Sequence, residues 1–336
     1  GTSGGGTGGS GGASTSTGGT TGTGGSTAGT GGSGGSSATV PDAGGSDGTA
    51  DTSGAAPDAT GATDPGTMGN GRFMINRPAV PPEAAGRLPG VAAGMMRTIQ
   101  IPAGVLPARS AQVYTPPGYV NGTPVAFMVF HDGGAYVGNF RIPTIFDNLI
   151  AAKKIPPMVG IFIPPSGNRS GEYDTVSDRY GRYVITDVFP QVERLGIKLT
   201  TDPEAGGVGG HSSGGICAFT MAWFHNDRFR RVLSNSGSFL SLQNTGGNNY
   251  DMMLRMTMPK KVIRTAMTAG TNDLACCGTT WYAANERMYK ALSESGYNAR
   301  YLVIQGGNHD QSNPMPTTPE LIEWLWRGYP VTGPTR

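Results

Sequence analysis

From Arg97 onward, short apolar runs alternate with amphipathic stretches, and this alternation is the strongest constraint on what the chain can fold into. Two of the runs, Val125–Phe130 and Met158–Ile163, are apolar throughout, as expected for strands covered on both faces. Stretches with apolar residues at helical spacing separate the strands. Strands that alternate with helices predict an α/β fold with a mostly parallel central sheet and helices on both faces, a three-layer sandwich.

The same pattern places the other elements. Further strands are expected at 97–101 and 111–114, forming a hairpin at one edge, and at 206–210, 231–234, 262–267 and 300–304. Helices are expected at 144–153, 176–195, 214–224, 281–295 and 319–327.

Residues 1–70 differ in composition from the rest of the chain. They contain 25 of the 56 glycines, no Lys, no Arg and no aromatic residue, and their only charges are five aspartates. The net charge of +2 therefore divides into −5 for this segment and +7 for residues 71–336. Such a segment buries too little apolar area to offset the entropy lost on ordering. We expect a disordered leader at 1–70 and one domain at 71–336.

The composition excludes several classes of protein. A charge of +7 over the domain, without a block of five Lys or Arg, argues against a nucleic-acid-binding face. Glycine has no three-residue period, which excludes collagen, and no run of eighteen apolar residues could span a membrane. The three cysteines have no zinc-ligand spacing, and no H-E-x-x-H motif occurs. We expect neither a metal nor a cofactor, and the oligomeric state stays open.

The leader also suggests a location. As a Gly/Ser-rich coil it would have an end-to-end distance of about 45 Å. We expect an exported protein, periplasmic, secreted or held at a membrane surface as a bacterial lipoprotein, with the leader as the tether. The alternative is that the leader is a linker from a larger polypeptide.

A nucleophile-elbow motif, G-x-S-x-G, spans Gly210-His211-Ser212-Ser213-Gly214. Its glycines suit a strained turn between a strand and a helix. The motif alone is weak, because the same spacing occurs by chance in the leader, around Ser3, Ser10, Ser33 and Ser46. Ser212 differs in its context, since an expected strand precedes it and an expected helix follows it. We therefore predict that Ser212 is the nucleophile of a serine hydrolase.

Such an elbow is followed along the chain by an acid and then by a histidine. Of the four histidines, only His225 and His309 lie after Ser212. His225 falls near the end of the nucleophile helix, whereas His309 follows the last expected strand, so His309 is the predicted base. Asp273 lies in the loop at 269–274, which follows the strand at 262–267, and is the predicted acid, ahead of Asp310 and Glu286.

The chemistry also needs two backbone N–H groups that stabilise the oxyanion. One belongs to Ser213, the residue after the nucleophile. The other should come from the loop that follows Val125–Phe130, where Gly133 and Gly134 let the backbone approach a substrate closely. Gly134 is the predicted second donor.

Six segments resemble the esterase branch of the α/β-hydrolase superfamily, which includes enterochelin esterases, esterase D, feruloyl esterases and mycolyltransferases. They are VFHDGGAYV at 129–137, NRSGEYDTVSDRYGRY at 168–183, GGHSSGGICAFTMAWFHNDRFRRVLSNSGSF at 209–239, AGTNDL at 269–274, WYAANERMYKALSESGYNARYLVIQGGNHD at 281–310 and LIEWLWRGY at 321–329. The resemblance implies a Ser212–Asp273–His309 triad with an oxyanion hole from Gly134 and Ser213. It also implies that Arg169 and Glu172, in an R-x-x-E pattern, brace the site from behind.

Two further expectations concern the surroundings of the site. Tyr136 and Trp281 could line a substrate subsite, although aromatic residues at such positions more often belong to the core. Cys217 could form a disulfide with Cys276 or Cys277 and brace the acid loop; the alternative is three unpaired cysteines.

We therefore predict a serine esterase that hydrolyses a small-molecule or polymer-linked carboxylic ester through an acyl-enzyme. The alternatives are an acyltransferase with the same triad and a catalytically inactive, surface-tethered binding protein. The sequence leaves the ester open among siderophore, feruloyl, acetyl and polyester substrates.

Overall fold

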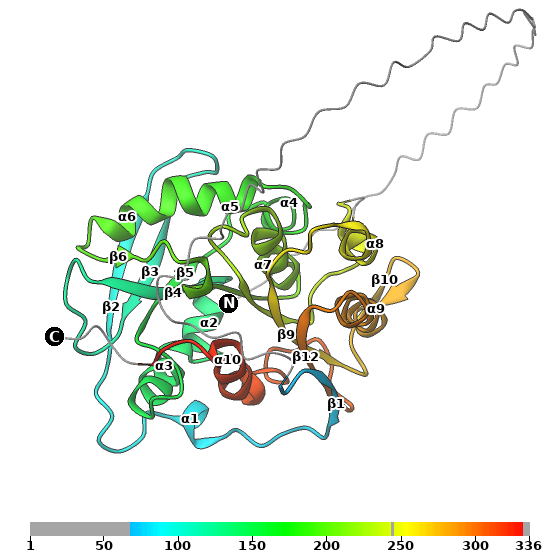
Figure 1. The fold of residues 1–336 in the computed structure, drawn as a ribbon, viewed down its shortest axis with the longest axis horizontal. Coiled ribbons are helices and arrows are strands. Elements are labelled where there is room, and N and C mark those ends of the chain that lie inside the picture. The colour runs from blue at the N-terminus through cyan, green and yellow to red at the C-terminus, as the bar shows by residue number, and fades with distance from the viewer. Residues whose placement is uncertain (1–67, 243–244, 332–336) are drawn as a thin grey trace, which may run out of the picture. The chain divides into compact units, whose positions relative to one another are not determined.

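The computed structural model describes residues 68–242 and 245–331. Its centre is a mostly parallel ten-stranded sheet with the order β1-β12-β9-β8-β7-β4-β5-β3-β2, in which β6 pairs with β4 (Figure 1). The strands are β1 Gly71–Ile75, β2 Met95–Ile101, β3 Arg109–Thr115, β4 Pro124–His131, β5 Met158–Ile163, β6 Lys198–Leu199, β7 Gly206–His211, β8 Arg231–Asn235, β9 Arg264–Gly270 and β12 Asn298–Ile304. A separate hairpin joins β10 Ala275–Cys276 to β11 Thr279–Thr280.

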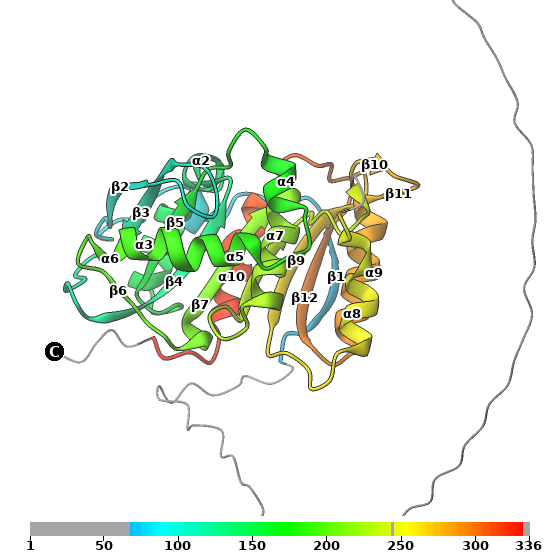
Figure 2. The same ribbon diagram turned by 90° about the horizontal axis from the view of Figure 1, so that it is seen from above.

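Helices cover both faces of this sheet (Figure 2). One face packs against α5 Arg179–Tyr183, α6 Phe189–Glu193, α7 Ser213–Phe224, α8 Tyr250–Met256 and α9 Trp281–Glu294. The other packs against α1 Pro82–Ala85, α2 Gly133–Gly138, α3 Ile142–Ala151 and α10 Thr318–Trp326. The short helix α4 Arg169–Tyr173 lies beside α7. The predicted three-layer α/β sandwich is confirmed.

Strand β4 shows why the sheet needs both layers. Its residues Phe127 and Val129 belong to the core beneath α7, whereas Met128 and Phe130 belong to the core beneath α3 and α10. Successive side chains of a strand point to opposite faces, so a strand whose central residues are all apolar must be covered on both faces.

Two features differ from the sequence expectation. The edge hairpin of β2 and β3 is confirmed, but β1 adds an unexpected parallel strand beyond β12. The helix expected at 176–195 is divided into α5, a π-helical turn at Val184–Val188, and α6. Pro190 in the first turn of α6 explains the break, because proline has no N–H to continue the helical hydrogen bonds. Within the described residues, no helix is both long and apolar enough to cross a membrane.

Candidate active site

Ser212 lies at the tight turn between β7 and α7. Its φ of 58° and ψ of −122° are unusual for a residue with a side chain, which is the strain expected of a nucleophile elbow. The flanking glycines make the turn possible: a Cβ on Gly210 would lie 2.0 Å from the Gly214 carbonyl oxygen. The close approach of these two backbones therefore requires glycine at position 210.

Ser212, His309 and Asp273 form one chain of hydrogen bonds. The Ser212 Oγ lies 2.8 Å from the His309 Nε2, and the His309 Nδ1 lies 2.5 Å from the Asp273 Oδ1. Burial, the largest influence on Asp273, raises the pKa of its carboxyl, but the hydrogen bond and charge of His309 and the Ser236 hydroxyl together lower that pKa below its usual value. Asp273 is therefore ionised at neutral pH and accepts a hydrogen bond from the Nδ1–H of His309.

The sheet brings the acid and histidine loops together. Strands β9 and β12 are parallel neighbours, so the loops that follow them leave the same edge of the sheet. Asn272 N donates to the Gly307 carbonyl oxygen at 2.8 Å, and a Cβ on Gly270 would lie 2.1 Å from that oxygen. The two loops thus contact each other through backbone atoms, which sets the spacing between Asp273 and His309.

The other histidines have different surroundings. His131 is buried, its Nδ1 contacts the Gly209 carbonyl oxygen, and burial lowers its pKa to about 4. His225 ends α7 and contacts the Asp178 carbonyl oxygen. His211 packs its ring 4.8 Å from that of His309, and burial, followed by the charge of His309, lowers its pKa to about 4. His131 and His211 are therefore neutral at pH 7.

The loop expected to provide an oxyanion donor leads directly into α2, so Gly134 lies in the first turn of a helix. The first N–H groups of a helix have no partner within it, and open space surrounds the position of a Gly134 Cβ. Ser213 is likewise the first residue of α7. A Cβ on Gly214 would lie 3.1 Å from the His131 Cβ. The two helix starts are therefore close to each other.

Arg169 and Glu172 pair with other residues and not with each other. Arg169 forms a bidentate ion pair with Asp132, with N–O distances of 2.7 and 2.8 Å. Glu172 forms a bidentate pair with Arg109, at 2.8 and 2.7 Å. Burial, the largest influence on Glu172, raises its pKa, but the hydrogen bonds of Arg109 and Ser166 lower the pKa overall. Each ion pair connects α4 to a different part of the sheet.

The two aromatic candidates have different outcomes. Tyr136 is fully buried and stacks on Phe140 with ring centroids 4.3 Å apart, so it belongs to the core and the subsite prediction for it was wrong. Trp281 lies with its ring centroid 5.3 Å from that of His309. It is therefore placed beside the triad.

The expected cysteine pairing was also wrong. Cys276 and Cys277 form a disulfide with each other, and Cys217 is free and buried in α7. Two adjacent cysteines can pair only when the backbone between them takes an unusual conformation. Their adjacency in the sequence therefore did not predict this bond. It lies in the β10–β11 hairpin, directly after the acid loop.

Two residues of the site were missed. Asp132, the partner of Arg169, lies in the loop that follows β4, and the sequence assigned it no role. Ser238 comes from the segment that follows β8, and its Oγ lies 3.5 Å from the Ser212 Oγ. The position of Ser238 beyond the carboxyl end of a parallel strand is a signal that could have found it, because ligands bind at that edge.

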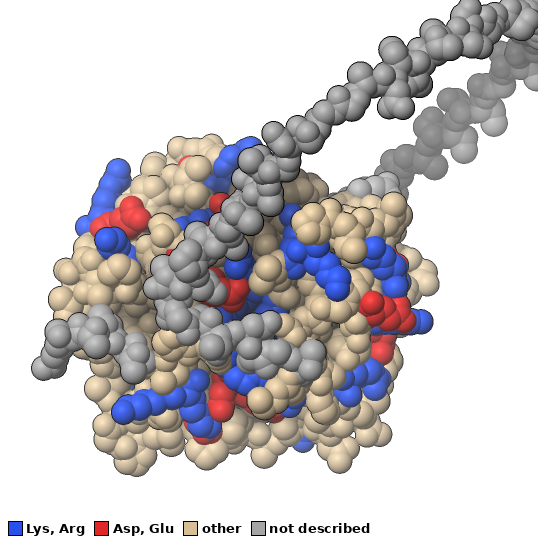
Figure 3. Space-filling model, viewed as in Figure 1, with Lys and Arg blue, Asp and Glu red and all other residues tan. Residues whose placement is uncertain are grey.

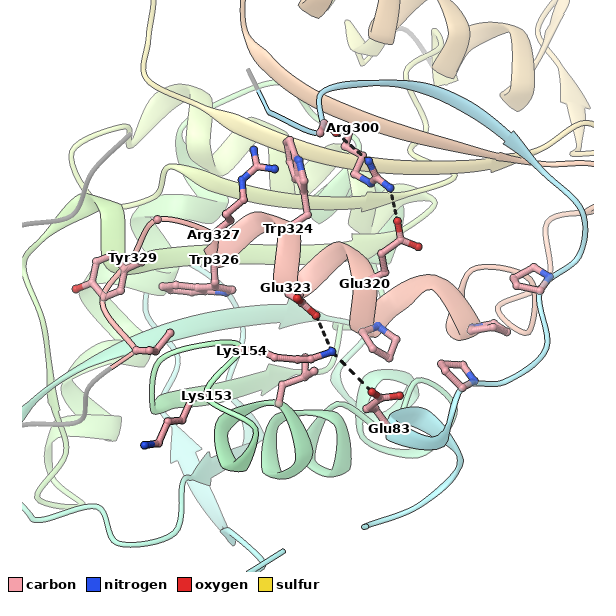
Figure 4. A pocket seen from close by; sticks show the side chains of 18 of the residues that line it. Glu83, Lys153, Lys154, Arg300, Glu320, Glu323, Trp324, Trp326, Arg327 and Tyr329 are labelled. Carbon is pink, nitrogen blue, oxygen red and sulfur yellow. Dashed lines mark hydrogen bonds and ion pairs between the residues drawn. The ribbon is translucent and has the colours of Figure 1, made fainter. Parts of the chain in front are cut away.

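Other surface features do not overlap the triad. A pocket of about 860 Å³ is lined by residues of α10, α3 and the segments at both ends of the described chain, including Trp324, Arg327 and Lys153 (Figure 4). On the face seen in Figure 3, acidic and basic side chains are interspersed. Among the described residues, no cluster of three or more His, Cys, Asp or Glu could hold a metal ion.

A family profile described as "Putative esterase" matches residues 107–313, which is more than half of the chain. The chain belongs to this esterase family. A search of curated proteins found no match.

Solved structures of esterases share the fold. The enterobactin esterase of Shigella flexneri, solved with enterobactin, is 18% identical with a TM-score of 0.63, and the match covers 74% of this chain and 63% of that one. The ferulic acid esterase of Anaeromyces mucronatus is 15% identical with a TM-score of 0.58, covering 74% and 96%. The feruloyl esterase module of Clostridium thermocellum, complexed with sinapinate, is 16% identical with a TM-score of 0.59, covering 78% and 98%. The match thus spans less than two thirds of the Shigella protein.

Proposed function

We propose that this member of the esterase family hydrolyses carboxylic esters through Ser212, His309 and Asp273 by way of an acyl-enzyme. The observation that carries the proposal is the unbroken chain of short contacts from Ser212 through His309 to Asp273. The Ser212 Oγ attacks the ester carbonyl while its proton passes to the His309 Nε2. His309 returns that proton to the departing alcohol, and a water activated in the same way releases the acid. Asp273 holds the His309 ring and stabilises its positive form.

The N–H groups of Gly134 and Ser213 stabilise the oxyanion in this proposal. Their support is that both lie in first turns of helices, where N–H groups lack a helical partner. Gly133 supports the same arrangement, because a Cβ there would lie 2.4 Å from the Phe162 carbonyl carbon in β5. Glycine at 133 lets α2 begin tightly against the sheet and turn Gly134 outward.

For the substrate, we propose an ester of the enterochelin or feruloyl type. The structural neighbours include an enterobactin esterase and two ferulic or feruloyl esterases. The indole of Trp281 beside His309 provides an apolar wall of the kind that would suit an aromatic acyl group. A panel of enterobactin, feruloyl, acetyl and polyester substrates tests this: an acetyl ester hydrolysed better than the aromatic ones would contradict it.

Two substitutions and one control test the triad. Ser212→Ala and His309→Ala should each lower kcat on a p-nitrophenyl ester by at least about 10³-fold. His225→Ala is the matched control, because His225 lies at the far end of α7, and it should keep wild-type activity. Labelling with a fluorophosphonate probe should disappear in Ser212→Ala. Wild-type kcat in that variant would overturn the mechanism.

The same assays test the alternatives. A wild-type protein that does not react with the fluorophosphonate would be a binding protein with an inactive site. New esters formed after addition of an alcohol would identify an acyltransferase.

We also propose export, with the leader as a tether at a membrane surface. Residues 1–67 of the leader lie outside the described residues, so the composition of the leader is the support from sequence. The Cys276–Cys277 disulfide adds support, because disulfides persist mainly in oxidising compartments. Cell fractionation and mass spectrometry of the native N-terminus test the proposal: recovery in the cytoplasm would contradict it.

A further inference from the structure

Ser238 is a buried serine next to the nucleophile that the triad mechanism does not use. Its Oγ lies 3.5 Å from the Ser212 Oγ and 3.1 Å from the indole nitrogen Nε1 of Trp281. Ser238 is only 1% exposed. A hydroxyl in this position, between a nucleophile and an indole, can influence the reaction without touching the substrate.

The direction of each hydrogen bond follows from the chemistry of the groups. The indole N–H of Trp281 can only donate, so the Ser238 Oγ accepts there. The ionised Asp273 can only accept, so the His309 Nδ1–H donates to it. When His309 acts as the base, its Nε2 carries no proton and accepts a hydrogen bond from the Ser212 hydroxyl.

The Ser212 proton is therefore already engaged, and across the serine pair the donor must be Ser238. The 3.5 Å separation is long for such a bond. Hydrogen bonds in active sites are often long before substrate binds and shorten in the reacting complex.

The backbone holds the two serines together. Ser212 N donates to the Asn235 carbonyl oxygen at 2.9 Å, and Ser238 N donates to the Ser212 carbonyl oxygen at 3.1 Å. The buried amide of Asn285 in α9 donates to the carbonyl oxygens of both Gly237 and Trp281, at 2.9 and 2.8 Å. Trp281 and the segment that carries Ser238 are thus anchored to the same side chain.

We propose that Ser238, oriented by Trp281, is a positioning residue for the nucleophile. It donates to the Ser212 Oγ, which keeps the Ser212 hydroxyl aimed at His309. During attack the Ser212 O–H bond breaks, its proton moves to the His309 Nε2, and the new bond forms between the Ser212 Oγ and the carbonyl carbon. Ser238 keeps its own proton throughout and offsets part of the negative charge that develops on the attacking oxygen. This inference rests on the proposed role of Ser212.

The test compares four variants by steady-state kinetics on a p-nitrophenyl ester and by the rate of fluorophosphonate labelling. Ser238→Ala should lower kcat and the labelling rate about tenfold with KM unchanged. Trp281→Phe keeps a ring against His309 but removes the donor, and should lower kcat about threefold. The double variant should be no slower than Ser238→Ala alone, because both substitutions disrupt the same chain of hydrogen bonds from Trp281 through Ser238 to Ser212. Ser238→Thr, which keeps the hydroxyl, should recover most of the activity.

Ser234→Ala is the matched control. Ser234 is a fully buried serine near the end of β8. Its hydroxyl forms no hydrogen bond with Ser212 or Trp281. It should keep wild-type kcat.

Wild-type kcat in Ser238→Ala, or an equal loss in Ser234→Ala, would overturn the inference. So would losses that multiply in the double variant, or a Trp281→Phe variant in which only KM rises. Ser212→Ala separates a failure of the proposed function from a failure of the positioning role. An active Ser212→Ala variant refutes the proposed function. An inactive Ser212→Ala variant together with an unimpaired Ser238→Ala variant refutes only the positioning role.

Discussion

The two sides of the active site are held by different kinds of interaction. The oxyanion side, where β4 meets α2 and α4, is braced by the Arg169–Asp132 and Arg109–Glu172 ion pairs. On the histidine side, formed by the loops after β9 and β12 and the start of α9, the bracing comes from neutral groups. There the indole of Trp281 donates to the Ser238 hydroxyl, and the loops bond through their backbones.

The difference matches the role that the proposed mechanism gives to each side. In the proposed mechanism the histidine side carries the moving proton, so a fixed charge beside His309, other than that of Asp273, would favour one protonation state over the other. The oxyanion side keeps its own charges unchanged while it holds backbone N–H groups in place, so ion pairs can brace it. Substitutions on the two sides should therefore have effects of different kinds.

The largest expected effect is on the histidine side. Asp273→Asn should lower kcat about 10⁴-fold with the fold intact, because the amide no longer stabilises the His309 tautomer and charge that catalysis needs. Steady-state kinetics with a circular-dichroism check measure this. Asp310→Asn is the control, since Asp310 is exposed and accepts from Ser312 N. A loss of similar size in Asp310→Asn would mean that the acid has been assigned wrongly.

The next largest effect is on stability, on the oxyanion side. Glu172→Gln leaves the buried Arg109 guanidinium unpaired and should lower the free energy of unfolding by about 3–5 kcal/mol. Denaturant unfolding measures the loss. Asp178→Asn, which removes an exposed partner of Arg182, is the control and should cost less than about 1 kcal/mol.

The effect of Glu172→Gln should also depend on pH. The folded state lowers the pKa of Glu172, so its contribution to stability is fully present above the unfolded pKa of about 4.3. That contribution is lost as the pH falls through the lower folded pKa. The gap between wild type and variant should therefore narrow below about pH 4. A gap that widens in acid would contradict the ion-pair explanation.

A smaller effect is expected for Asp132→Asn. Asp132 has a left-handed φ of 52°, which Asn tolerates well, so the backbone should keep its course while Arg169 loses its charged partner. We expect kcat to fall about tenfold, by the loss of one charge-assisted hydrogen-bond pair. Because the Arg169–Asp132 pair is partly exposed, high salt should screen it and lower the kcat of the wild type toward that of the variant. Salt-independent kcat in the wild type would show that the pair does not brace the site.

The smallest effect should come from the disulfide. Asn272 and Asp273 are held by backbone bonds that precede the hairpin, so reducing Cys276–Cys277 should change kcat by less than about twofold. Thiol titration of the denatured, unreduced protein should find one thiol, that of Cys217. Three thiols before reduction would contradict the Cys276–Cys277 pairing. A large loss of kcat on reduction would show that the β10–β11 hairpin helps to hold the acid loop in place.

Much of the fold was predictable because its signals are local. Val125–Phe130 and Met158–Ile163 identify buried strands by composition alone, and the actual strands differ from them by at most two residues. The elbow at Ser212 was predictable because a glycine-flanked turn between a strand and a helix depends on neighbouring residues. Strand β1 was not predictable, since its pairing with β12 joins residues more than two hundred positions apart.

The surroundings of the site likewise divide into features that depend on neighbouring residues and features that depend on contacts between distant segments. The partners of Arg169 and Glu172, the burial of Tyr136 and the contact of Ser238 with Ser212 all depend on how separate segments pack. Sequence spacing within the R-x-x-E pattern carried no information about Asp132 or Arg109, which belong to other strands and their loops.

The sequence by itself determined the class of fold and the glycine-flanked turn at Ser212, and it predicted an acid and then a histidine after Ser212 in the chain. These properties rest on periodicity and on backbone conformations that short segments impose. Only the tertiary structure decided that His309 reaches Ser212, that the cysteines of the hairpin pair with each other, and that Ser238 lies against the nucleophile. Those outcomes depend on distances between segments far apart in the chain, which are set when the parallel strands pair and their carboxyl ends meet at one edge of the sheet.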